Sequence, residues 1–70
     1  MSELVECYSG HTYAGRPKAL YWQGTRLEVS EILKEWLTPG CIHYLVTTNS
    51  DESFLVTYDM NLDQWFIQQS

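Results

Sequence analysis

The chain has 70 residues and a formal net charge of −5, and aromatic residues make up 14% of it. This length suits a single domain, because compact domains usually span about 50 to 250 residues. The acidic balance argues against a general nucleic-acid binder, because nonspecific affinity comes mostly from cations that neutralise phosphates.

The first residues, Met1 to Glu6, have neither the basic region nor the apolar run of a signal peptide. No stretch approaches the roughly 20 apolar residues that a membrane-spanning helix needs. Two cysteines, Cys7 and Cys41, are fewer than small secreted domains usually carry. We therefore expect a cytoplasmic protein that makes no membrane contact.

Strands dominate the predicted elements of the first third. Residues 3–8 are typical of a first strand, and 14–17 of a loop. Residues 18–22 and 26–29 predict a hairpin around a Gln-Gly turn. A two-residue turn fixes the cross-strand pairs of this hairpin: Leu20 with Leu27, and Tyr21 with Arg26.

Residues 29–37 admit two interpretations. Their apolar residues fall at the i, i+3, i+4, i+7 and i+8 positions of an amphipathic helix: Val29, Ile32, Leu33, Trp36 and Leu37. Pro39 and Gly40 would end such a helix. The alternative is a long bent strand that continues from Arg26 with a bulge near Ser30. The match at all five positions favours the helix.

The last third predicts three strands, at 42–48, 54–58 and 65–68. Alternation places one set of large residues on a shared face: Tyr44 and Val46, then Phe54, Val56 and Tyr58, then Trp65 and Ile67. We expect this set to meet Trp22 and Trp36 in one core, because large rings bury much area in a short chain.

These elements predict one mainly-β domain over residues 1–70. Short strands joined mostly by hairpins favour an antiparallel sheet of five to six strands, curved or closed into a small barrel. One short helix at 29–37 would make the domain α+β.

Several motifs occur together between Arg16 and Ile67: Arg16-Pro17, residues 20–24, 27–36, 44–48 and 54–59, and Trp65-Phe66. In combination they resemble an uncharacterised prokaryotic domain that occurs alone or, in some bacteria, behind Y-family-type DNA polymerase modules. Typical relatives carry arginine where this chain has Gln23 and Thr25. The resemblance therefore implies a fold, and no activity or DNA-linked role for particular residues.

Two cysteines and two histidines give the donor count of a tetrahedral zinc site: Cys7, His11, Cys41 and His43. Their spacing does not match the common zinc-binding arrangements, so this set is a weak candidate and we expect no metal or other cofactor. No nucleophile elbow or phosphate-binding glycine loop is present. We therefore expect a protein that is not an enzyme.

Positive charge gathers near the N-terminus. Residues 1–26 carry three cations and two acids, whereas residues 27–70 carry Lys34 and seven acids. A small barrel could bind single strands there, through a ring beside basic residues. The candidate corner is Arg16, Lys18, Tyr21 and Arg26.

Protein interaction is the function that this sequence favours. Exposed rings and open sheet edges, such as 65–68, suit another protein or a second copy of the chain. We predict a non-catalytic interaction or accessory module, with weak single-stranded nucleic-acid binding as the alternative.

Overall fold

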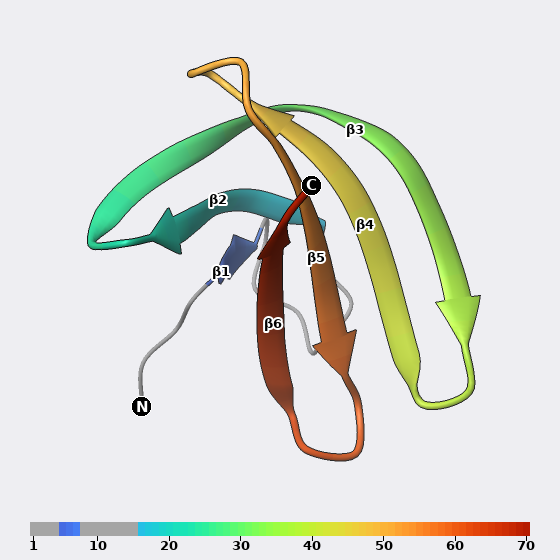
Figure 1. The fold of residues 1–70 in the computed structure, drawn as a ribbon. Coiled ribbons are helices and arrows are strands. Elements are labelled where there is room, and N and C mark those ends of the chain that lie inside the picture. Colours follow the sequence, from blue (N-terminus) through green and yellow to red (C-terminus); the bar gives the residue numbers. More distant parts are fainter. Residues whose placement is uncertain (1–4, 8–15) are drawn as a thin grey trace.

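The computed structural model describes residues 5–7 and 16–70, which form one sheet of six antiparallel strands in the order β1-β2-β3-β4-β5-β6 (Figure 1). The strands are β1 (Val5–Cys7), β2 (Pro17–Trp22), β3 (Thr25–Thr38), β4 (Cys41–Thr48), β5 (Ser53–Asp59) and β6 (Gln64–Gln69). Within this part of the chain, no helix is long and apolar enough to cross a membrane. The mainly-β prediction is confirmed.

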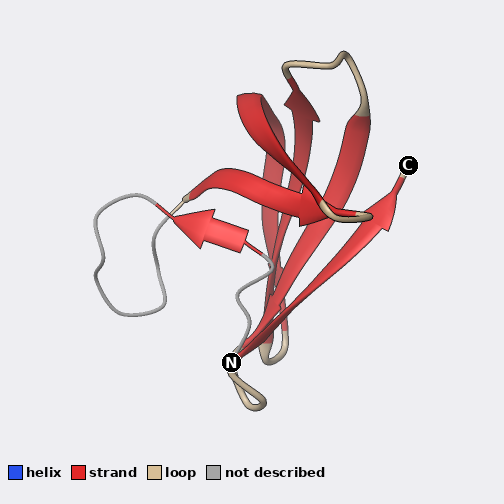
Figure 2. Cartoon of the chain, turned by 90° about the vertical axis from the view of Figure 1, so that its left-hand side faces the viewer, coloured by secondary structure: helices blue, strands red, loops and turns tan. Residues whose placement is uncertain are grey.

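The sheet curls into a half-barrel. Each strand pairs with the next along the chain, and the long strand β3 arches over the top of the fold (Figure 1). The view turned by 90° shows β1, which follows the N-terminus, running across the direction of β6, which ends at the C-terminus (Figure 2). The first and last strands thus cross without closing a barrel.

The predicted helix at 29–37 is wrong, because these residues belong to β3. The strand pairs with β2 through residues 25–28 and with β4 through residues 29–38. Its register with β4 slips at Ser30 and again at Leu33. Such bulges bend a strand and increase its twist, which turns β3 from one side of the half-barrel to the other. The bent-strand alternative, with a bulge near Ser30, is confirmed.

The β2–β3 hairpin has the predicted register. Leu20 lies opposite Leu27, and Tyr21 lies opposite Arg26. Gln23 and Gly24 form the turn with positive φ angles of 51° and 82°. Two positive values are the mark of the type I′ turn, whose twist matches that of the flanking strands.

The core fills the concave side of the sheet. Its buried residues are Val5, Leu20, Tyr44, Val46, Phe54 and Val56. The Trp22 ring meets Phe54 edge-on at 5.3 Å, and Trp65 lies 4.9 Å from the Tyr58 ring. Trp36 was expected in this core, but it is 38% exposed and its strand turns it to the opposite side.

Candidate interaction surface

Apolar side chains lie among polar ones on the convex side of the sheet. Trp36, His43, Thr57 and Phe66 lie in register across β3, β4, β5 and β6. Leu45 and Leu55 pair in the adjacent row. All six lie on the face opposite the buried residues, because successive side chains of a strand alternate between faces. We call Trp36, His43, Leu45, Leu55, Thr57 and Phe66 the outer-face patch.

The two ends of the outer-face patch are its most exposed members. Trp36 on β3 is 38% exposed, and Phe66 on β6 is 49% exposed. Leu45 and Leu55, between them, are half-buried by their neighbours. The row of Leu45 and Leu55 ends in Lys34 on β3 and Gln68 on β6. A solvated sheet face is normally polar, so the four apolar members of the patch depart from the pattern of a sheet that only meets water.

His43 is held rigidly at the centre of the patch. Its Nε2 shares a hydrogen bond with the Thr38 hydroxyl at 2.8 Å, and its Nδ1 shares one with the Thr57 hydroxyl at 2.9 Å. Its ring stacks on Trp36 with centroids 5.2 Å apart. Both ring nitrogens are therefore occupied, and the stack holds the Trp36 ring against His43.

Charge on the outer face lies mainly on β3, where Lys34 is opposite Leu45 and Glu31 is opposite Thr47. Among the residues of β4, β5 and β6, Asp59 is the single charged one. The rest of the net charge of −5 thus arises outside these three strands. Asp59 serves the β5–β6 turn, where its Oδ1 accepts hydrogen bonds from the backbone N–H groups of Asn61 and Leu62 at 2.9 and 3.0 Å.

At the predicted nucleic-acid corner, the structure brings Tyr21 and Arg26 together around an acid. Glu6 of β1 accepts hydrogen bonds from the Tyr21 hydroxyl at 2.5 Å and from Arg26 Nη2 at 2.9 Å. Arg26 also pairs with Glu28 at 3.2 Å. The hydrogen bonds from Arg26 and Tyr21 lower the pKa of Glu6 to about 2. The charge of Arg26 is therefore already compensated within the fold.

The other two cations of that corner differ in position. Arg16 reaches Glu35 of β3 at 3.5 Å. Lys18 is the extra residue where the β1–β2 register shifts, and its charge helps to lower the pKa of Glu6. Arg16 and Arg26 thus each face a carboxylate.

Tyr44 lies in the core near these groups. Burial, together with the nearby charge of Glu35, raises the pKa of Tyr44 above its ordinary value.

Three of the four candidate zinc ligands lie within the described residues, and His11 lies outside them. Cys7 is on β1, and Cys41 and His43 are on β4. Neither cysteine is in a disulfide. In the part of the chain that the structure describes, no three His, Cys, Asp or Glu residues gather as a metal site. The four-residue set stays a prediction.

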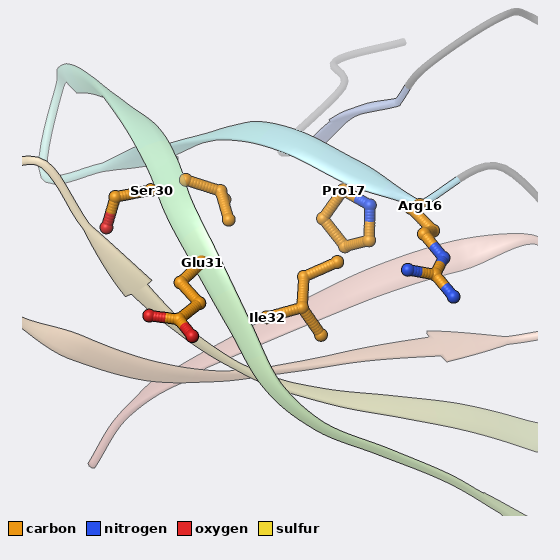
Figure 3. Close-up of a pocket in the computed structure, with 6 residues that line it drawn as sticks. Arg16, Pro17, Ser30, Glu31 and Ile32 are labelled. Carbon is orange, nitrogen blue, oxygen red and sulfur yellow. The ribbon is translucent and has the colours of Figure 1, made fainter.

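A shallow depression of about 270 Å³ lies where β3 leaves β2 (Figure 3). Arg16 and Pro17 line one side, and Ser30, Glu31 and Ile32 line the other. The polar members of this lining are all exposed, so the depression presents no buried polar group to a small ligand.

Comparison with protein-family models, curated proteins and solved structures finds no match to this chain. The resemblance to the prokaryotic domain therefore stays a prediction.

The sequence did not single out Leu45, Leu55 or Phe66 as surface residues. A signal was nevertheless present, since each alternates with residues assigned to the core. Leu45 stands between Tyr44 and Val46, so this part of the strand has apolar residues on both faces. Apolar residues at outward positions of neighbouring strands, as at Leu45, Leu55 and Phe66, are the pattern that indicates such a patch.

Proposed function

We propose that this chain is a non-catalytic protein-interaction module that binds its partner through the outer-face patch. The observation that carries the proposal is a group of four apolar residues on the outer face, on a sheet whose strands β4 to β6 carry one charged residue, Asp59: Trp36, Leu45, Leu55 and Phe66. The cores of protein interfaces are depleted in charge and enriched in aromatic residues. The rigid Trp36–His43 stack fits the role of a central anchor.

The charge distribution favours a protein partner over a nucleic acid. Arg26 hydrogen-bonds Glu6 and Glu28, and Arg16 pairs with Glu35. Fewer uncompensated cations remain to neutralise phosphates. The non-catalytic part of the proposal is supported by His43, whose nitrogens both engage threonine hydroxyls and so do not serve Cys41 as a base.

The test compares two aromatic residues of equal exposure on different surfaces. Trp36 is 38% exposed on the patch, and Tyr21 is 37% exposed at the hairpin corner. A protein recovered from the native host is purified and titrated against wild type, Trp36→Ala and Tyr21→Ala. Loss of a hot-spot ring costs about 2 kcal/mol or more, so we expect Trp36→Ala to weaken binding about thirtyfold. Tyr21→Ala should bind as the wild type does.

Two results would overturn this function. One is a partner whose affinity is the same for all three proteins, since the patch would then be uninvolved. The other is binding of a single-stranded oligonucleotide at low salt that Tyr21→Ala abolishes and Trp36→Ala retains. That second result would establish the nucleic-acid alternative. Thermal unfolding of each variant confirms that the fold is intact.

A further inference from the structure

The last strand leaves one side of the sheet open. β6 stands at the end of the strand order, and β5 is its one hydrogen-bonded neighbour among the described strands. Its six residues, Gln64–Gln69, include no charged residue, no proline and no glycine. An edge of this kind is a template for another strand, and most proteins protect it.

The contrast with a second open edge is informative. From Ser30 to Thr38, β3 pairs with β4 on one side, and no described strand pairs with its other side. That edge carries two bulges and the charges of Glu31, Lys34 and Glu35, which are the usual defences against edge-to-edge pairing. The β5–β6 ladder has no register shift. Of these two edges, β6 is the one fitted to accept a strand.

The ladder also determines which backbone groups face outward. The Ser70 N–H donates to the Ser53 carbonyl at 3.0 Å, in continuation of the β5–β6 register. Hydrogen-bonded pairs alternate along an antiparallel ladder. The N–H and C=O groups of Trp65, Ile67 and Gln69 therefore point toward the open edge.

We propose that β6 pairs antiparallel with β6 of a second copy of this chain, around a two-fold axis beside Phe66. A two-fold axis perpendicular to the sheet keeps each residue on its own face, so Phe66 meets Phe66 of the other copy. Trp65 then lies opposite Ile67, and Gln64 opposite Gln68. Phe66 thus pairs with an aromatic residue, Trp65 with a β-branched one and Gln64 with another glutamine. Aromatic–aromatic pairs and aromatic–β-branched pairs stabilise a sheet.

Self-complementarity identifies the second copy as the occupant, because the register sets Phe66 against itself and Trp65 against Ile67. Two chains of charge −5 repel each other, and β6, which has no charged residue, adds nothing to that repulsion where the two copies meet. This register uses the outward-facing groups of Trp65 and Ile67 for hydrogen bonds. It also covers Phe66, which is 49% exposed in a single chain. The proposal goes beyond the proposed function and does not depend on it.

The test places charges at Gln64 and Gln68, which are both exposed and lie outside the core. Gln64→Lys with Gln68→Lys sets like charges opposite each other twice, and Gln64→Glu with Gln68→Lys sets opposite charges there. Sedimentation equilibrium measures the dimer dissociation constant. We expect the double lysine variant to weaken the dimer about tenfold, and the Glu/Lys variant to match or exceed the wild type. Gln23→Lys with Thr25→Lys adds the same net charge at the β2–β3 turn and should leave the dimer unchanged.

Amide hydrogen exchange tests the register directly. As concentration rises, the amides of Trp65 and Ile67 should become protected, and that of Gln69 should not. Added protection of Gln69 would place the axis beside Ile67 and overturn this register. A wild-type chain that stays monomeric, or a dimer insensitive to charge at positions 64 and 68, would overturn the proposal. Trp36→Ala should dimerise as the wild type does. If the dimer prediction fails, the partner-binding experiment with Trp36→Ala can therefore still be interpreted.

Discussion

Glu6 shows how one acidic side chain joins three strands. It lies on β1 and accepts three hydrogen bonds, from Tyr21 on β2 and Arg26 on β3. These donors favour the ionised carboxylate, which is why the pKa of Glu6 falls to about 2. The same cluster raises the pKa of Tyr21 above its ordinary value, because the neutral phenol donates to the carboxylate.

This residue makes stability depend on pH in the acid range. Since the pKa of Glu6 is lower in the folded chain than its ordinary value of 4.5, the carboxylate stabilises the fold above about pH 4.5. That contribution is lost as the pH falls toward about 2. The difference in free energy of unfolding between wild type and Glu6→Gln should therefore be greatest near neutral pH and vanish near pH 2. Urea unfolding across this range measures it, and a constant difference would contradict the role of Glu6.

At the level of elements, Gly24 and Gly40 have the same backbone conformation but different surroundings. Gly24 and Gly40 have similar φ angles of 82° and 80°. A Cβ on Gly24 meets nothing within 4 Å, whereas on Gly40 it lies 3.0 Å from Asn61 Nδ2. The Gly40 carbonyl also accepts a hydrogen bond from Met60 N–H at 2.8 Å, which links the β3–β4 and β5–β6 turns.

Alanine at each glycine should therefore destabilise the domain to different extents. Gly24→Ala should cost about 1–2 kcal/mol, which is the cost of a left-handed residue with a Cβ. Gly40→Ala should cost more, because Asn61 must also move away. The free energies of unfolding of the two variants give the comparison. An equal cost would mean that Asn61 moves freely and that the two turns are not tightly joined.

The segment 29–37 shows why sequence periodicity can mislead. Val29, Ile32 and Glu35 lie opposite Thr48, Val46 and Tyr44, which are all buried, so these three face inward. Each bulge adds one residue between inward positions and changes their spacing from two to three. The step of three from Val29 to Ile32 thus imitates the start of a helical pattern, whereas Trp36 of that pattern lies on the outer face. The sequence carries no signal that distinguishes the helix from the bulged strand, because the difference lies in the pairing with β4.

Elsewhere, local pattern was sufficient. The β2–β3 register follows from a two-residue turn, and the core faces of β4, β5 and β6 follow from alternation. The candidate nucleic-acid corner was less predictable, because Arg16 and Arg26 were assigned to it for their closeness along the chain. Each arginine in fact faces a different carboxylate, Glu35 or Glu6, brought from a distant strand. Such pairing depends on tertiary structure, which composition does not reveal.

For the whole molecule, one curled sheet provides both the core and the outer-face patch. Its concave side buries the core, and its convex side carries the outer-face patch, so β4 has large side chains on both faces. A second layer would normally cover such a sheet, but none exists among the described residues. The fold therefore depends on a single small core, and Trp36 and Phe66 on its other face stay exposed.

That dependence predicts a steep response to loss of core volume. A domain of this length has a free energy of unfolding of about 3.5–10 kcal/mol. Leu20 is fully buried at the centre of the core, and Leu20→Ala should remove about 2–5 kcal/mol of that total. Leu62→Ala removes the same atoms from a side chain that is 58% exposed in the β5–β6 turn, and should change stability by less than about 0.5 kcal/mol. Urea unfolding of the two variants makes the comparison, and similar losses would show that the concave core does not dominate the stability of the half-barrel.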